Sequence, residues 1–159
     1  MRKQIQRNYI RKEPKNDYLK FYRVVRRFTL LKYDLSTADL EMMMYLYTAG
    51  LFTYQEFSVY ASNFSWDRHR FKRMKEGGWI HMFRDKVGAE YRLYELTRHG
   101  RHVIGNMYKM LNCEMEIPMA LKNNPVVART NYAEKALMIG IEEFNKYVRS
   151  KNPLKRREY

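Results

Sequence analysis

Cysteine and long apolar runs are nearly missing from this chain. Cys113 is the only cysteine among the 159 residues, which excludes a disulfide within the chain and favours a reducing compartment such as the cytoplasm. Apolar runs such as 42–47 hold only a few residues, so no segment approaches the roughly 18–20 residues of a membrane span. The basic N-terminus has no apolar segment behind it, and we expect no secretory signal.

Acidic residues are also scarce, because 17 Asp and Glu face 31 Lys and Arg, and the formal net charge is +14. Hydrophobic residues make up 45% of the chain, which is enough for a core, and the length suits one compact domain. A charge of +14 on 19.5 kDa predicts a polyanionic partner, most often nucleic acid. An acidic protein and a membrane surface are the alternatives that charge alone leaves open.

The excess positive charge gathers toward the ends of the chain. Residues 1–34 hold 11 basic and 3 acidic side chains, a net charge of +8, whereas residues 35–64 hold 3 acidic side chains and no basic ones. Segments 1–16 and 150–159 therefore have the composition of basic arms around a more apolar centre. Scattered surface lysines and arginines can also serve solubility alone.

Hydrophobic spacing and aromatic-rich stretches predict a mainly α chain with a small two-stranded β-wing. Helices are expected over 17–33, 37–48, 53–61, 65–76, 97–111 and 131–149, and strands over 79–83 and 91–96 with a short turn at 84–88. Residues 112–130 contain Pro118 and Pro125 and are expected to be a linker that can hold one helical turn. This order is that of a winged helix-turn-helix flanked by N- and C-terminal helices, with 17–111 as the winged-helix domain including its preceding helix.

Capping residues predict where these helices begin and end. Thr53 followed by Glu56, and Asn131 followed by Glu134, have the spacing of capping boxes. The other expected caps are Ser36 or Thr37, Ser65 and Thr97, and the expected helix stops are Gly50 and Gly77-Gly78. The side chains expected on the buried faces of the first, second and last helices are Phe21, Val24, Val25, Phe28, Leu31 and Leu35; Leu40, Met43, Met44 and Tyr47; and Ala133, Ala136, Leu137, Gly140, Phe144 and Val148.

Four short motifs lie in the order and spacing of MarR-type winged-helix regulators. They are Leu-Ser at 35–36, Asn-Phe-Ser at 63–65, Met-Lys-Glu-Gly-Gly-Trp-Ile at 74–80 and Tyr-Glu-Leu-Thr-Arg-His-Gly at 94–100. The chain resembles that family over residues 18–111. The resemblance implies a homodimeric transcription regulator that binds double-stranded DNA, with helix 65–76 in the major groove. It also implies a ligand-sensing cleft between the dimer helices and the winged domain, although no residue pattern identifies a ligand.

A helical wheel divides the expected recognition helix 65–76 into two faces. Phe64, Phe71 and Met74 fall together and are expected to face the core. The opposite side holds Trp66, His69, Arg70 and Arg73, with Ser65 and Lys72 at its edges. Arginine reads guanine through paired hydrogen bonds and lysine suits phosphate, so these are the candidate DNA contacts. Trp66 can equally be a core residue of the turn, and the basic side chains a solvated face.

The wing and the N-terminal arm supply the other candidate DNA contacts. The wing contributes Arg84, Lys86 and Arg92, and the arm contributes Arg2, Lys3, Arg7 and Arg11. In the family that the chain resembles, the first and last helices of two subunits interlock. The resemblance therefore implies a dimerisation role for helices 17–33 and 131–149, whose apolar faces can alternatively pair within one chain.

Catalysis finds little support, and we expect a protein that is not an enzyme and needs no cofactor or metal. His69, His81, His99 and His102 lack neighbouring ligands at metal-binding spacing, and Gly77-Gly78 follows a helix instead of opening a phosphate-binding loop. A second hypothesis is a structural or assembly protein of a viral or other nucleoprotein complex. In that case the winged fold and basic arms would contact proteins or packaged nucleic acid, within a virion or the host cytoplasm.

Overall fold

The computed structural model describes residues 17–63, 67, 69–128 and 131–152. The described elements are α1 (Leu19–Tyr33), α2 (Thr37–Ala49), α3 (Tyr54–Asn63), α4 (Arg70–Glu76), β1 (Ile80–Arg84), β2 (Leu93–Leu96), α5 (Arg98–Leu111), the 3₁₀ turn η1 (Pro125–Ala128) and α6 (Tyr132–Lys151). The predictions for the arm 1–16, with Arg2, Lys3, Arg7 and Arg11, lie outside the described residues. So do Phe64, Ser65 and Trp66 and most of the tail 150–159.

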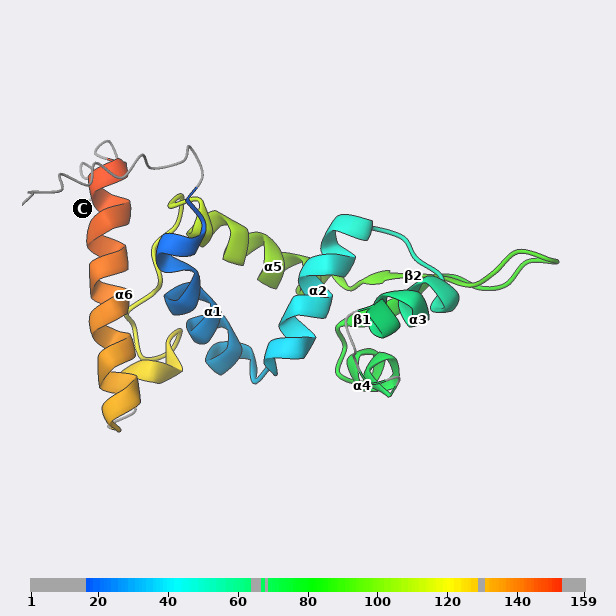
Figure 1. The fold of residues 1–159 in the computed structure, drawn as a ribbon, viewed down its shortest axis with the longest axis horizontal. Helices are drawn as coiled ribbons and strands as arrows, with labels where there is room; N and C mark the ends of the chain where they lie inside the picture. The colour runs from blue at the N-terminus through cyan, green and yellow to red at the C-terminus, as the bar shows by residue number, and fades with distance from the viewer. Residues whose placement is uncertain (1–16, 64–66, 68, 129–130, 153–159) are drawn as a thin grey trace, which may run out of the picture.

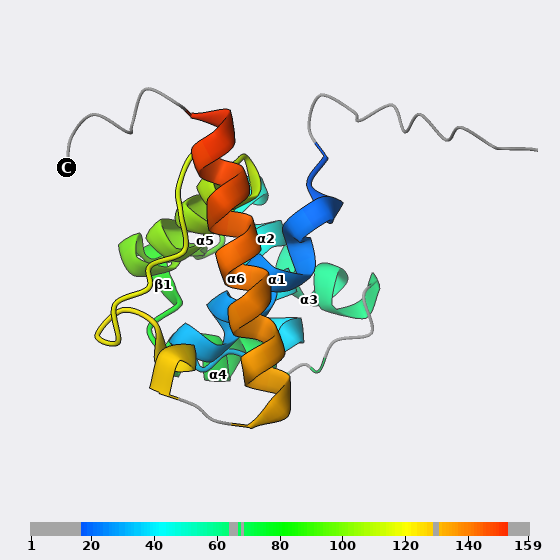
Figure 2. The ribbon, with the colours of Figure 1, turned by 90° about the vertical axis from the view of Figure 1, so that its left-hand side faces the viewer.

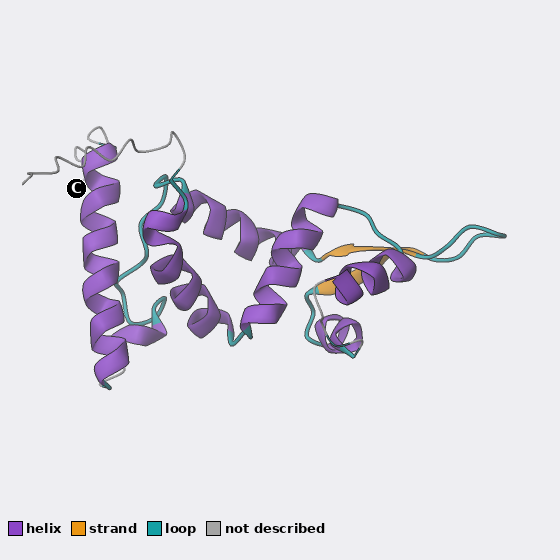
Figure 3. Cartoon of the chain, in the orientation of Figure 1, coloured by secondary structure: helices purple, strands orange, loops and turns teal. Residues whose placement is uncertain are grey.

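The described chain is mainly helical and has one two-stranded antiparallel sheet, as the sequence predicted (Figures 1 and 3). The helices α1, α5 and α6 lie at one end, the group of α3, α4 and the β1–β2 hairpin lies at the other, and α2 stands between them (Figure 1). Contacts of α2 with both α5 and β2 join the two groups.

Local capping sets the helix boundaries as the sequence predicted. Ser36 Oγ accepts a hydrogen bond from the Asp39 N–H at 3.1 Å, and Gly50 ends α2 with a positive φ of 75°. At the start of α3, Thr53 Oγ1 accepts from the Glu56 N–H at 3.2 Å, and Glu56 Oε2 accepts from the Thr53 N–H at 2.7 Å. This reciprocal pair is the predicted capping box.

The later caps are also confirmed. Thr97 Oγ1 accepts from the Gly100 N–H at 3.1 Å and donates to the Gly78 carbonyl at 2.8 Å, so one hydroxyl starts α5 and fastens it to the end of the α4 segment. Asn131 Oδ1 accepts from the Glu134 N–H at 2.9 Å at the start of α6.

The hairpin loop is longer than predicted. The second strand begins at Leu93 instead of 91, and residues 85–92 form the loop in place of a turn at 84–88. Tyr91 and Arg92 are exposed, whereas Tyr94 and Leu96 of β2 are buried, so the second strand begins only where its side chains reach the core. The pairing also shifts register between Met82 and Arg84. Figure 1 shows the loop projecting away from the helices.

The apolar faces of α1 and α6 pack against each other within the chain (Figure 2). Phe21 lies with its ring 5.2 Å from that of Phe144, which is fully buried with Val25 and Ile141. The same faces were predicted to meet a second subunit, and the intrachain alternative is the one that the structure shows.

Three side chains predicted to be buried are exposed. Ala133 and Ala136 lie open on α6, because that helix turns Ile141 and Asn145 inward beside the predicted Phe144 and Val148, a stripe that includes a polar residue. Tyr47 is 41% exposed on α2, where Met42 and Leu46 are buried in its place. The α2 sequence is apolar on several faces, so its spacing alone could not identify the inward one.

The connection 112–124 is fixed by a buried side-chain amide. Asn145 on α6 accepts a hydrogen bond from the Ile117 N–H at 2.8 Å and donates to the Ile117 carbonyl at 2.8 Å. Asn145 is 2% exposed and Ile117 1% exposed, so water does not replace these bonds. The predicted linker is therefore packed onto α6, and its predicted helical turn is η1.

We expect Asn145→Leu to lower the free energy of unfolding by about 2–4 kcal/mol, because both backbone groups of Ile117 lose their partner while the volume is nearly kept. Urea unfolding followed by circular dichroism measures the change. Asn112→Leu, an exposed position at the end of α5, is the matched control and should change stability by less than about 0.5 kcal/mol. Equal stability of the two variants would contradict the role given to Asn145.

Candidate nucleic-acid interface

The helix predicted to read DNA, α4, is held by aromatic packing on its inner side. Phe71 is 9% exposed, and its ring centroid lies 5.0 Å from those of Phe57 and Tyr94. Met74, one turn further, is 1% exposed. The predicted inward direction of Phe71 and Met74 is therefore confirmed.

The same helix is shorter than predicted. It begins at Arg70 instead of 65, and Asp67 stands before it in a turn whose carboxylate accepts from the His69 N–H at 2.9 Å. That hydrogen bond lowers the pKa of the Asp67 carboxyl, and the nearby His69 and Arg73 act in the same direction. In a helix that began at 65, the His69 N–H would donate to a backbone carbonyl one turn earlier. Here it donates to the Asp67 side chain instead.

The outer side of α4 carries basic side chains. His69, Lys72, Arg73 and Lys75 are exposed. Lys72 lies 3.8 Å from Glu76 and Arg73 lies 3.8 Å from Asp67, and ion pairs this long between exposed groups contribute little and exchange easily for another anion. Lys75 was missing from the predicted set, although its place three residues after Lys72 could have indicated it.

Arg70 corrects the prediction. Its side chain is only 11% exposed and forms an ion pair with Asp39 of α2, with Ser36 Oγ 3.4 Å away. The prediction that Arg70 lies on the outer, base-reading face is therefore wrong. A helical wheel compares positions within one helix and cannot show that the beginning of α2 lies beside this one. Arg70 joins α4 to α2 instead of facing outward.

The hairpin cations are partly neutralised by the hairpin itself. Arg84 lies 2.8 Å from Glu90, and Arg92 Nε donates to Asp85 at 2.6 Å. The hydrogen bond from Arg92, with one from the Lys86 N–H, lowers the pKa of the Asp85 carboxyl. The hydrogen bond to Asp85 raises the pKa of the Arg92 guanidinium. Lys86 is exposed and forms no ion pair with a described residue.

Glu95 ties the hairpin to α5. Its carboxylate lies 2.9 Å from His81 Nε2 on β1 and accepts from Arg101 of α5 at 2.6 Å. Burial alone would raise the pKa of Glu95, but the hydrogen bonds from His81 and Arg101 outweigh it and the pKa is lowered. This carboxylate fixes the base of the hairpin relative to the helices.

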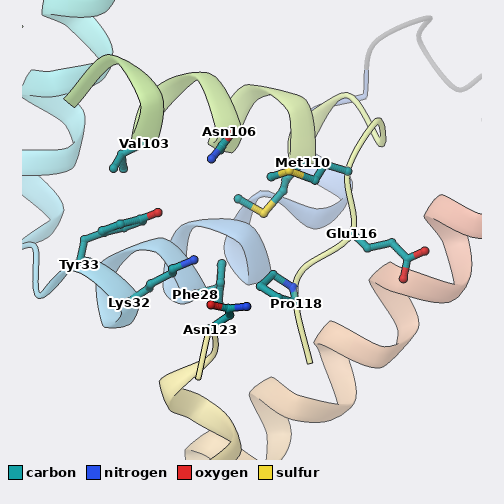
Figure 4. Close-up of a pocket in the computed structure, with 10 residues that line it drawn as sticks. Phe28, Lys32, Tyr33, Val103, Asn106, Met110, Glu116, Pro118 and Asn123 are labelled. Atoms are coloured by element: carbon teal, nitrogen blue, oxygen red, sulfur yellow. The ribbon is translucent and has the colours of Figure 1, made fainter. Parts of the chain in front are cut away.

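A cavity of about 330 Å³ lies between α1, α5 and the connection 115–123 (Figure 4). Lys32 lines it with its amine 5.6 Å from the Phe28 ring, and Glu116 at its edge pairs with Arg149 at 2.8 Å. Burial raises the pKa of the Tyr33 hydroxyl on the same wall. The charged groups Lys32 and Glu116 thus already interact with other side chains of the chain.

Comparisons with protein-family models, with curated proteins and with solved structures found no match to this chain. Within the described ranges, no helix has the length and apolarity needed to cross a membrane. The same residues contain no group of three or more His, Cys, Asp or Glu placed to hold a metal ion.

We expect the Arg70–Asp39 pair to show strong coupling in a double-mutant cycle of Asp39→Asn, Arg70→Met and the double variant. Asp39→Asn leaves a largely buried guanidinium without its counter-charge, whereas the double variant removes both charges, so the coupling energy should exceed about 1 kcal/mol. Urea unfolding measures it. The exposed Lys72–Glu76 pair, treated in the same way, should couple by less than about 0.5 kcal/mol. Additive changes at Asp39 and Arg70 would show that the pair does not join the helices.

Glu95 should make stability depend on acidic pH. Because its pKa in the folded chain is below its ordinary value of 4.5, its contribution is present above that value and is lost as the pH falls below it. The free energy of unfolding should therefore fall more steeply in acid for the unaltered chain than for Glu95→Gln. Urea titrations over a pH series test this, with the exposed Glu143→Gln as control. Parallel profiles of the unaltered chain and Glu95→Gln would contradict it.

Proposed function

We propose that this protein binds double-stranded DNA in the manner of a winged-helix transcription regulator, with α4 at the major groove and the β1–β2 hairpin along the backbone. The order of elements supports the proposal. Phe52, between α2 and α3, pairs with Tyr94 of β2 through hydrogen bonds of 3.0 and 2.8 Å, and α4 and the hairpin follow. The winged-helix interpretation requires this order, in which α2 is followed by the Phe52 bridge, by α3 and α4, and then by the β1–β2 hairpin.

The single observation that carries the proposal is the two-sided character of α4. Its inner side chains are locked in an aromatic core, and its exposed side chains are mostly cations. Because the inner side chains fix the orientation of this short helix, its cations have a fixed direction before any ligand binds. Binding at the outer face leaves the inner packing unchanged. Phosphates and guanine edges are the acceptors that such a surface fits.

The candidate residues divide by chemistry. Arg73 has the planar fork that pairs with a guanine edge, whereas Lys72 and Lys75 suit phosphates. Lys86 in the hairpin loop can contact a DNA phosphate directly. Arg84 and Arg92 would first have to release Glu90 and Asp85, with which they form ion pairs. Ser65, Trp66 and the N-terminal residues Arg2, Lys3, Arg7 and Arg11 stay predicted DNA contacts that lie outside the described residues.

A homodimer is part of this proposal, and its interface needs residues other than the α1–α6 contact. Since Phe21 and Phe144 already pack within the chain, the large apolar side chains left on α6 are Tyr132, 90% exposed, and Ile139, 60% exposed. A dimer joined there would carry two α4 helices, as the family resemblance implies.

One observation favours the second candidate function, an assembly protein of a nucleoprotein complex. Phe83, Val87 and Tyr91 are 55%, 63% and 63% exposed on the projecting hairpin, and two of its three cations are paired within it. A hairpin with this surface also suits an apolar contact with another protein.

We expect Arg73→Gln and Lys72→Gln to weaken DNA binding and to reduce its dependence on salt. Each lost phosphate contact should lower the slope of log affinity against log salt by about 1, and loss of a guanine contact should cost about 1–3 kcal/mol at the selected site only. Sequences selected from a random duplex pool provide the site, and fluorescence anisotropy at several salt concentrations gives the affinities. Lys109→Gln on α5 is the charge-matched control.

DNA affinity and self-assembly, measured on two sets of variants, separate the two candidate functions. If Lys72→Gln and Arg73→Gln together leave affinity and salt slope unchanged, α4 does not bind DNA and the first proposal is wrong. Loss of self-assembly or partner binding in Phe83→Ser with Tyr91→Ser, without loss of DNA affinity, would instead favour the assembly function.

A further inference from the structure

A groove of about 510 Å³ lies between α1 and the first turns of α6. Figure 1 shows these two helices at the end of the molecule away from α4. Arg23, Arg26 and Arg27 of α1 line one side of it. The other lining side chains are small or apolar, namely Val24, Ala133, Ala136 and Leu137. No carboxylate is among the described residues that line it, so the groove combines concentrated positive charge with an apolar wall.

The three arginines share one face of α1 because their spacing of three and four residues returns them to the same side of the helix. Like charges at this spacing repel one another. Arg23 and Arg27 are exposed, and neither forms an ion pair with a described residue. An anion placed among the three would relieve that repulsion.

Arg26 is the best evidence for a site rather than a solvated face. Its side chain is half-buried, its guanidinium lies 5.7 Å from the Tyr22 ring centroid, and its Nε is buried without any hydrogen-bond acceptor among the described residues. That Nε is closed off from the groove, so it is not the atom that a ligand would reach. The terminal guanidinium nitrogens of Arg26 make no hydrogen bond to a described residue, and they are the donors that Arg26 can offer to an anion in the groove.

The opposite wall is open because small residues form it. Gly140 lets the helices approach closely further along, since a Cβ there would lie 3.1 Å from Val24 Cγ2. Toward the start of α6, Ala133 and Ala136 fill little of the remaining space, and Leu137 adds an apolar surface. The volume falls within the roughly 300–1,000 Å³ that is usual for sites of small molecules.

We propose that this groove binds an organic phosphate, a phosphate monoester with an apolar body. The phosphate would lie among Arg23, Arg26 and Arg27 and accept hydrogen bonds from their terminal guanidinium nitrogens, and the body would lie against Val24, Ala136 and Leu137. A monoester near neutral pH carries almost two negative charges, which match three guanidinium groups better than one carboxylate does. The site is separate from α4 and does not depend on the DNA-binding proposal.

Hexyl phosphate is the probe, and isothermal titration calorimetry of the full chain is the measurement. It should bind at least about tenfold more tightly than inorganic phosphate or hexanol, because only the ester uses both walls. Equal affinity for hexyl phosphate and inorganic phosphate would overturn the proposal, since the apolar wall would then contribute nothing.

Two variants place the binding in the groove. Arg26→Gln removes the central charge and Ala136→Phe fills the space, and each should weaken hexyl phosphate binding at least about tenfold. Arg98→Gln on α5, which removes the same charge from an exposed position elsewhere, should leave it unchanged. Circular dichroism shows whether each variant is folded, and the unaltered affinity of two folded groove variants would overturn the proposal.

Further arms identify the source of the phosphate. Vesicles of phosphatidylcholine with phosphatidic acid that bind the unaltered chain and Arg98→Gln, but not Arg26→Gln, would support a lipid headgroup. Binding of the soluble ester without any such difference on vesicles would support a soluble metabolite. Displacement of hexyl phosphate by a short DNA duplex, to the same extent in Arg98→Gln, would overturn the proposal and make the groove a part of the nucleic-acid surface.

Discussion

The half of the molecule proposed to bind DNA depends on the packing around Tyr94. A helix of seven residues and a two-stranded hairpin are each marginal in water when isolated. Tyr94 joins them, because its backbone pairs with Phe52, its ring lies 5.0 Å from that of Phe71, and its strand pairs with β1. Each of these short elements is stable only where the others complete the aromatic cluster, so α4 and the hairpin form one unit.

That packing decides which charges are presented outward. Once Phe71 and Met74 are fixed inward, Lys72, Arg73 and Lys75 have no direction left except solvent. Arg70 is the exception, since it lies at the edge of the packed face and is drawn to Asp39. The positive surface of α4 is therefore a consequence of its apolar face, and Arg70 adjusts how α4 stands against α2.

The sequence predicted what depends on neighbouring residues along the chain. The caps at Ser36, Thr53 and Thr97 involve donors and acceptors within three residues, so their spacing was sufficient. It did not predict the partner of Arg70, which is 31 residues away, nor the clamp of Ile117 by Asn145, which is 28 residues away. The length of the hairpin loop also escaped prediction, because aromatic content predicts a strand whether or not a core lies beneath it.

Arg70 and Arg26 show how the same group can serve two purposes. Each has a buried Nε without an acceptor among the described residues. The charge of Arg70 is neutralised by Asp39 within the fold, and this ion pair holds α4 against α2. Arg26 has two more arginines beside it, and no described residue that lines its groove is a carboxylate. Water solvates the exposed Arg23 and Arg27, but Arg26 is partly withdrawn from water, so a bound anion would add the counter-charge that no described lining residue supplies.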